Sequence, residues 1–247
     1  MVSFLEHHRE YSPDHPALIW ADAQVSFAEL ASRSESLAAG LAAMGLLAGD
    51  RVFLFIPMSP ELYTAMLAVH RVGAIAVFLD SWARRGELEN CLAQTSPHCF
   101  IGSEDALHWL RGRPTSIAIM LATGTPRDPS QPCLTTLANT GYSIPVAPVD
   151  GEHTALVTYT TGSSGKPRGA NRTHRFLAAQ HRALAKCLPY STNDIDLPVF
   201  PIFSLNNLAC GVTTVLPTVD LAQPGETDGD ELFQQMLAAK VTTCTLS

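Results

Sequence analysis

Tyr159-Thr-Thr-Gly-Ser-Ser-Gly-Lys-Pro-Arg-Gly169 is the stretch that decides how this 247-residue chain folds, and it combines three glycines with two cations and no acidic residue. Glycine lets the backbone approach a ligand closely, so that main-chain N–H groups and hydroxyls can converge on an oxyanion. The stretch therefore predicts a phosphate-binding loop. Its expected cradle is Thr160, Thr161, Gly162, Ser163, Ser164 and Gly165, and Lys166 and Arg168 supply the countercharge.

The sequence around this loop is basic, although the chain as a whole has a net charge of −7. From His153 to Asn193 there is no Asp or Glu. A local basic region in an acidic protein indicates a bound anion. The cations of the region are Lys166, Arg168, Arg172, Arg175, Arg182 and Lys186.

A flexible linker could have the same composition, but the flanks argue against one. Thr154 to Thr160 is a β-branched, half-apolar run typical of a strand, and Thr173-His174 opens a helical segment, so the glycines lie in a tight turn. The loop is not a Walker A motif, which needs a hydroxyl residue after the lysine where Pro167 stands. Gly162 to Gly165 is also one residue too short for a nucleophile elbow.

The first half of the chain alternates buried strands with helices. Ser26 and Glu29 form a capping box that starts a helix, and Ser59-Pro60 is an N-cap followed by proline at the first helical position. Repeated strand-helix-strand order predicts an α/β fold of doubly wound, largely parallel sheets covered by helices. The expected strands are 51–57, 74–79, 98–101 and 116–121, and the expected helices are 26–44, 60–72, 84–94 and 104–110.

A proline-rich segment with few long apolar runs separates two parts of the chain. We predict a first α/β subdomain at 1–125, a surface connection at 126–150 with one helical turn near 134–138, and the start of a second α/β subdomain at 151–247. The elements expected after the loop are a helix to about residue 188, an extended piece at 197–201, a helix at 205–214, a short strand at 215–216, a helix at 228–240 and a strand at 241–246.

Composition excludes several classes of protein. No apolar run reaches the ~18 residues of a membrane span, and the first residues lack a secretion signal, so we expect a cytoplasmic protein. The six cysteines have neither disulfide-framework nor metal-site spacing, which predicts reduced thiols and no metal site of the chain's own. An acidic protein, with a sequence pI of about 5.7, is also a poor candidate for nucleic-acid binding.

The eleven residues from Tyr159 to Gly169 resemble the phosphate-binding loop of the adenylate-forming superfamily, with Arg168 where lysine is more usual. This superfamily includes acyl-CoA synthetases, firefly luciferase and the adenylation domains of peptide synthetases. Val25 to Leu30 and Leu67 to Asp80 also resemble elements of the superfamily, in the expected order. The resemblance implies the N-terminal part of the large domain of such an enzyme, with ATP and Mg²⁺ as its cofactors.

The segment from Asp196 to Leu208 is most similar to olefin β-lactone synthetases, as is Gly211 to Pro217. It corresponds to a superfamily motif whose histidine lies beside the substrate carboxylate. Here Ser204 stands in place of that histidine. The resemblance implies that Phe203, Ser204 and Asn206 contact the substrate. Phe200 and Phe203 also fit simple core packing, which is the more common fate of an aromatic residue in an apolar run.

Three residues near the loop have plainer interpretations. His174 is expected to be a structural residue at the start of a helix. Arg172 and Arg175 are expected to lie on a solvated face and to make no ligand contact.

The implied reaction joins a fatty or β-hydroxy acid to ATP and gives acyl-AMP and pyrophosphate, followed by β-lactone formation. The alternatives are an acyl-CoA ligase that uses CoA, a non-catalytic nucleotide-binding module, and an interaction protein. Other motifs of the superfamily do not occur by Ser247, and the sequence ends in an apolar strand pattern. We therefore expect an N-terminal portion that is inactive alone, whose partner is the remainder of the enzyme and whose catalytic residues lie beyond 247.

Overall fold

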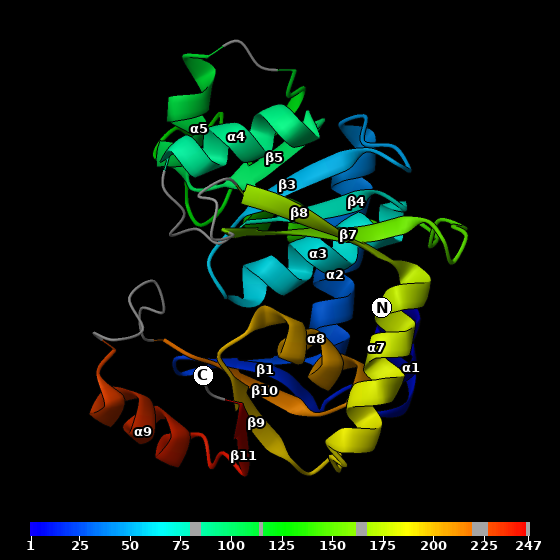
Figure 1. Cartoon of the computed structure of the whole chain (residues 1–247), viewed down its shortest axis with the longest axis vertical. Coiled ribbons are helices and arrows are strands. Elements are labelled where there is room, and N and C mark those ends of the chain that lie inside the picture. Colours follow the sequence, from blue (N-terminus) through cyan, green and yellow to red (C-terminus); the bar gives the residue numbers. More distant parts are fainter. Residues whose placement is uncertain (80–84, 114–115, 162–166, 219–226, 246–247) are drawn as a thin grey trace. The chain divides into compact units, whose positions relative to one another are not determined.

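A computed structural model of the chain describes residues 1–79, 85–113, 116–161, 167–218 and 227–245. They form two compact units, which are described separately. The six-stranded unit comprises residues 32–57 and 61–177, and the five-stranded unit comprises 1–31, 58–60 and 178–247. Each unit is built on one β-sheet (Figure 1).

The sheet of the six-stranded unit has the strand order β6-β5-β3-β4-β7-β8. Its strands are parallel except for β8, which is antiparallel to β7. An α/β fold with largely parallel strands is what the sequence predicts. The strands are β3 (Arg51–Phe55), β4 (Ile75–Phe78), β5 (Cys99–Gly102), β6 (Ile119–Ala122), β7 (Thr154–Thr161) and β8 (Pro167–Thr173).

Helices cover both faces of this sheet, as right-handed crossovers require when the strand order reverses after β4. On one face, α4 and α5 bury a core in which the rings of Phe53 and Phe100 stack with centroids 5.7 Å apart. Figure 1 shows α2 and α3 on the other side of the sheet from α4 and α5. The helices are α2 (Phe27–Ala43), α3 (Pro60–Val72), α4 (Arg85–Thr95), α5 (Glu104–Arg111) and α6 (Leu134–Ala138).

The sheet of the five-stranded unit has the order β11-β9-β10-β1-β2 and is parallel except for the β1–β2 pair. Leu18 of β1 pairs with Thr214 of β10, so the two ends of the chain share one sheet. The strands are β1 (Pro16–Trp20), β2 (Ala23–Ser26), β9 (Ile195–Pro198), β10 (Thr213–Leu216) and β11 (Thr243–Thr245). The helices are α1 (Val2–Tyr11), α7 (His174–Cys187), which begins in the six-stranded unit, α8 (Pro201–Cys210) and α9 (Gly229–Ala238).

Local signals explain most helix boundaries. The capping box is present: the Ser26 amide donates to Glu29 at 2.9 Å, and the Glu29 amide donates to Ser26 Oγ at 3.2 Å. Gly73, with φ of +78°, ends α3, as the sequence predicts. The bounds of the helix predicted at 205–214 are wrong, because α8 begins with Pro201 in its first turn and ends before Gly211, which is in the left-handed conformation.

Four elements were not predicted from the sequence: α1, β1, β2 and β8. Most of β8 is polar and exposed, so it lacks the apolar pattern of a buried strand.

The proline-rich segment at 126–150 has little regular structure apart from α6, yet its end is bound to α3. Arg71 Nη1 donates to the Ile144 carbonyl at 3.1 Å, and the Ala147 amide donates to the Arg71 carbonyl at 2.8 Å. The subdomain boundaries at 125 and 150 stay a prediction from composition. Within the described ranges, no helix is both long and apolar enough to cross a bilayer.

Candidate functional site

The predicted phosphate loop lies between the two strands of the β7–β8 hairpin. Thr161 at the end of β7 pairs with Pro167 at the start of β8, and Thr160 pairs with Arg168. Gly162, Ser163, Ser164, Gly165 and Lys166 lie outside the described residues, as do the side chains of Thr160 and Thr161. The hairpin therefore fixes the backbone at both ends of the loop.

The loop follows the carboxyl end of β7, which is the edge at which parallel α/β sheets bind ligands. β7 runs parallel to β4, with Phe78 opposite Thr158, and continues beyond this last pair to Thr161. Gly169 lies opposite Tyr159, and a Cβ atom at Gly169 would lie 3.2 Å from Tyr159 Cζ. Here glycine allows the second strand to lie closely over the tyrosine ring.

Side chains from α4 and from the hairpin itself support the base of the loop. Gln94 Nε2 of α4 donates to the Pro167 carbonyl at 3.4 Å. Arg172 Nη1 donates to Thr158 Oγ1, which links the two strands. Burial raises the pKa of Tyr159, so its phenol stays neutral at pH 7. Arg168 is exposed and makes no ion pair with the residues that the structure describes.

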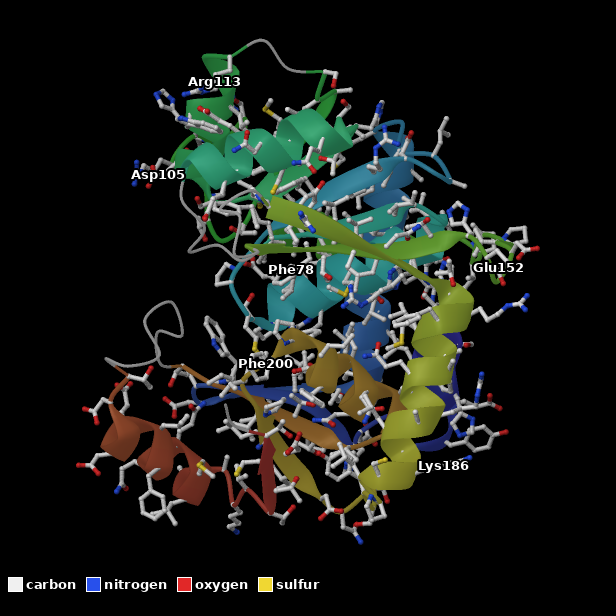
Figure 2. The ribbon with its side chains drawn as sticks, in the orientation of Figure 1. Phe78, Asp105, Arg113, Glu152, Lys186 and Phe200 are labelled. Carbon is white, nitrogen blue, oxygen red and sulfur yellow. The ribbon has the colours of Figure 1, made fainter. Side chains whose placement is uncertain are left out.

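Two cations near the loop have partners within the protein. Arg175 forms a 2.5 Å ion pair with Glu152, which lies in the turn before β7 (Figure 2). The guanidinium of Arg172 also lies 5.9 Å from the ring of Phe176. Both cations thus contact other groups of the protein.

His174 is the first residue of α7, and its amide donates to the His153 carbonyl at 3.1 Å. Burial lowers the pKa of His174, and the neighbouring His153 acts in the same direction. The ring of His174 also lies against that of His70. Nothing local in the sequence indicates this arrangement, because the three histidines are brought together only by the fold.

The residues expected to contact the acid substrate lie on α8, in the five-stranded unit. Phe203 is half-buried and its ring centroid lies 6.3 Å from that of Phe200, which is 43% exposed. Neither ring is part of the fully buried core. Phe200 is visible at the start of α8 in Figure 2.

Ser204 and Asn206 are buried polar residues on the same helix. Ser204 is fully buried, and its Oγ has no hydrogen-bond partner among the described residues. Asn206 Oδ1 accepts a bond from His181 Nδ1 at 3.0 Å, while its Nδ2 has no partner in the described part of the chain. Buried polar groups are normally bonded, so these two atoms depart from the usual pattern.

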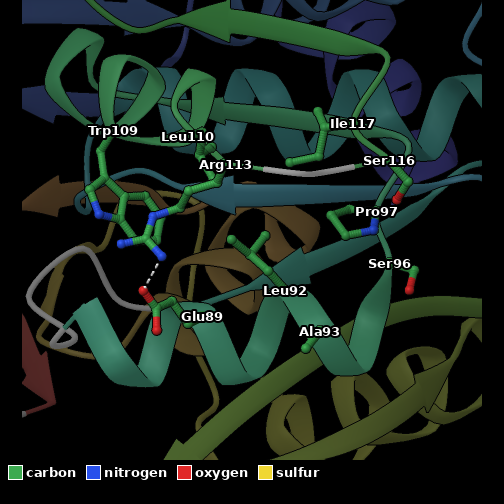
Figure 3. Close-up of a pocket in the computed structure, with 10 residues that line it drawn as sticks. All are labelled: Glu89, Leu92, Ala93, Ser96, Pro97, Trp109, Leu110, Arg113, Ser116 and Ile117. Carbon is green, nitrogen blue, oxygen red and sulfur yellow. Dashed lines mark ion pairs between the residues drawn. The ribbon is translucent and has the colours of Figure 1, made fainter.

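A separate surface pocket of about 430 Å³ lies between α4 and α5 (Figure 3). One end holds Arg113, which pairs with Glu89 at 2.6 Å and lies over the ring of Trp109 at 4.2 Å. The charges in this pocket neutralise each other, so it is not a second anion site. Leu92, Leu110 and Ile117 form its apolar lining.

The geometry fits an oxyanion better than a metal ion held by the chain itself. The loop carries hydroxyls, glycines and two cations at a sheet edge, and Arg168 is exposed beside it. In the described ranges, no three His, Cys, Asp or Glu side chains gather at metal-binding distance.

Comparison with known proteins identifies the family of the chain. Residues 5–247 match the model of the AMP-binding enzyme family. The chain is 32% identical over 226 residues to an olefin beta-lactone synthetase of Stenotrophomonas maltophilia, and the match covers 90% of this chain and 41% of that protein. The chain thus spans about two fifths of that relative's length.

Solved structures show the same fold. The N-terminal subdomain of Klebsiella oxytoca NpsA in complex with 3-hydroxybenzoyl-AMSN superposes with a TM-score of 0.79 at 25% identity, over 100% of this chain and 59% of that one. A long-chain-fatty-acid-CoA ligase (FadD1) from Archaeoglobus fulgidus gives a TM-score of 0.84 at 21% identity, over 98% of this chain and 50% of that one. This chain belongs to the AMP-binding enzyme family.

Proposed function

We propose that the protein activates a carboxylic acid with ATP, and that the acid is a fatty acid or a β-hydroxy fatty acid. The observation that carries the proposal is the β7–β8 hairpin, which holds the sequence Tyr159 to Gly169 at the carboxyl edge of a parallel sheet. The similarity to an olefin beta-lactone synthetase supports the β-hydroxy acid.

The first step would form acyl-AMP. A carboxylate oxygen attacks the α-phosphorus of ATP, the bond from that phosphorus to the bridging oxygen breaks, and pyrophosphate leaves. Two anions must meet, and the leaving group gains charge, so preorganised donors and cations lower the barrier. In this chain, residues 160–165 would bind the phosphates, and Lys166 and Arg168 would neutralise the leaving pyrophosphate. Mg²⁺, when bound, neutralises further phosphate charge.

The second step would be intramolecular. The β-hydroxyl of the acyl-AMP attacks the acyl carbonyl, its proton passes to a base, and AMP leaves with formation of a four-membered lactone. We propose that Phe203 packs on the acyl chain and that Ser204 and Asn206 bind polar atoms of the acid. The unpartnered Ser204 Oγ and Asn206 Nδ2 support this assignment.

A second candidate function is CoA ligation, in which the thiol of CoA displaces AMP. The fold shared with the fatty-acid-CoA ligase of Archaeoglobus fulgidus is compatible with it, but a likeness at 21% identity is one of fold alone. A third candidate is nucleotide binding without chemistry. Cytoplasmic location, the need for the remainder of the enzyme, and inactivity of the 247 residues alone stay predictions.

The test is pyrophosphate release by the complete gene product, measured with plain and β-hydroxy fatty acids, each with and without CoA. The proposal expects release that requires ATP and Mg²⁺, with a β-lactone formed from the β-hydroxy acid and no need for CoA. A thioester formed only with CoA would favour the ligase. If ATP binds but no acid gives pyrophosphate release, only the nucleotide-binding module stays supported. If ATP does not bind and no pyrophosphate is released, all three candidate functions are rejected.

A further inference from the structure

Three histidine rings lie side by side next to the β7–β8 hairpin. We call His70, His153 and His174 the histidine row. The centroids of His70 and His174 lie 5.6 Å apart at an interplanar angle of 66°. Those of His153 and His174 lie 6.2 Å apart at 21°. The three residues come from the last turn of α3, from the residue before β7 and from the start of α7, so the row joins three elements of the six-stranded unit.

Each member makes one directional bond to a neighbouring backbone group. His70 Nε2 lies 3.0 Å from the Ala155 carbonyl oxygen, and His153 Nε2 lies 3.1 Å from the Gly73 carbonyl oxygen. Because a carbonyl oxygen only accepts, both Nε2 atoms carry the proton. The His174 amide completes the row by its bond to the His153 carbonyl.

The bond from His70 reaches the one place where the hairpin changes register. Thr154 pairs with Thr173 and Leu156 pairs with Arg172, so Ala155 is an extra residue on β7 between the two pairs. Such a bulge fixes which residues face each other along the rest of the hairpin. A slip of one residue would turn every side chain of a strand to the opposite face of the sheet. The face on which Arg168 lies, opposite Thr160, thus depends on this bulge.

Stability alone does not account for a histidine at position 70. The side chain is 2% exposed, and its Nδ1 has no partner among the described residues. The ring of His174 likewise has a buried Nε2 with no hydrogen-bond partner among the described groups. An apolar residue would avoid leaving buried nitrogens unpaired. What only a donor at position 70 supplies is the bond to Ala155.

We propose that His70 is a positioning residue that holds the Ala155 bulge, and that His174 packs the ring of His70 in place. Together they set the register of the β7–β8 hairpin and so the face on which Arg168 meets the nucleotide phosphates. The role in nucleotide binding rests on the function proposed above. The role in hairpin register does not.

The experiment compares His70→Leu, which removes the donor, with His70→Gln, whose amide can still donate to Ala155. Amide hydrogen exchange of the intact chain without nucleotide reports on the hairpin. We expect exchange at Leu156–Tyr159 and Gly169–Arg172 to be about tenfold faster in the leucine variant, with β5 and α5 unchanged. The glutamine variant should be close to the parent. Equal protection of the hairpin in the leucine variant and the parent would overturn the proposal, as would equal loss in both variants.

A general loss of stability needs its own control. Leu107→Ala removes a fully buried side chain of α5 from the core on the other side of the sheet and should destabilise the unit without selective opening of the hairpin. If His70→Leu fails to fold, His174→Phe and His174→Ala give the same test. The phenyl ring should keep the parental protection, and alanine should lose it. Identical hairpin exchange in these two variants would overturn the role of the row.

ATP titration of the same variants separates the two proposals. We expect His70→Leu to weaken binding about tenfold and His70→Gln to restore it, whereas Leu107→Ala should bind as the parent does while folded. Absence of ATP binding by the parent counts against the proposed function, and the exchange result then decides the role of His70.

Discussion

Asn207 Nδ2 of α8 donates to Asp196 Oδ2 of β9 at 2.7 Å, and both side chains are fully buried. The other carboxylate oxygen accepts from Thr243 Oγ1 of β11 at 2.9 Å. The carboxylate thus joins a helix and two strands of the five-stranded unit. A buried carboxylate is tolerated only when its oxygens are bonded, so this unit depends on the amide of Asn207.

Asn207→Leu should therefore destabilise the protein by about 3 kcal/mol, because the buried Asp196 Oδ2 would lose the amide that donates to it. Chemical denaturation monitored by circular dichroism measures the change. Asn193→Leu, at an exposed position of the same unit, should change the free energy of unfolding by less than about 0.5 kcal/mol. Equal effects of the two substitutions would contradict the importance of the bond.

Gly211→Ala should be destabilising by roughly 2 kcal/mol for two separable reasons. Its φ is +76°, and an added Cβ would lie 2.6 Å from Cε1 of His8, whose ring bonds to the Ala209 carbonyl. Gly141, with φ of +75° and nothing within 4 Å, isolates the backbone strain. Gly141→Ala should cost less, and combining His8→Ala with Gly211→Ala should cost less than the sum of the single changes. Additive losses would show that the clash is absent.

Gly169→Ala should weaken ATP binding more than it weakens the fold. The added methyl group would lie 3.1 Å from Val157 Cγ1 and 3.2 Å from Tyr159 Cζ, which forces β8 away from β7 beside the loop. Gly86→Ala is the matched control, since a Cβ there meets nothing within 4 Å and alanine favours a helix. Isothermal titration with ATP compares the two. An unchanged dissociation constant for Gly169→Ala would show that the close approach is not needed.

Lys166→Ala and Arg168→Ala should each reduce ATP use by the complete enzyme by at least about tenfold, with little change in the temperature of unfolding, since loop charges contribute little burial. Gly165→Val should act in the same direction. Arg175→Ala is the matched control, since it also removes one positive charge but from an exposed arginine that is paired with Glu152. Pyrophosphate exchange is the measurement. Equal losses for Arg168 and Arg175 would indicate a general effect of net charge.

The histidine row should make the protein less stable as the pH falls. Burial lowers the pKa of His70 from 6.5 to about 3, so the unfolded chain binds its proton first. The contribution of His70 to the free energy of unfolding is therefore fully present above pH 6.5. It is lost progressively toward pH 3, by up to about 1.4 kcal/mol per pH unit. Urea midpoints measured across this range should fall more steeply for the parent than for His70→Leu. Parallel curves would contradict the assignment.

The sequence predicted helix ends that neighbouring residues specify and missed strands that form only by pairing with another strand. The capping box at Ser26 and the glycine stop at Gly73 are set by neighbouring residues, so both were predicted correctly. β8 was missed because its residues are polar and its pairing with β7 creates the strand. β1 was missed for a similar reason, since it pairs with β10 near the other end of the chain.

The candidate site also combines residues that the sequence indicates with residues whose contacts only the structure shows. The loop at 159–169 was predicted because a short segment carries its chemistry, whereas Gln94 and His70 each bond to a hairpin residue more than seventy positions away. A lone histidine in an apolar helix has no local signal of such a role. Ser204 was singled out by comparison with a motif, but its lack of a hydrogen-bond partner among the described residues could come only from the structure.

The bonds between Arg71 and the segment from Ile144 to Ala147 affect where a protease can cleave the chain and where an insertion would be tolerated. Cleavage by a protease requires several residues of backbone to detach and enter the enzyme's active site. Backbone tied to a buried arginine, 4% exposed, resists such detachment despite its irregular shape. The stretch near 126–130 is instead held by exposed bonds at the surface, where the amides of Arg127 and Asp128 donate to the Glu104 carboxylate of α5. Trypsin should thus nick the connection at Arg127, and the same place is where an inserted peptide or a new pair of chain ends would be best tolerated.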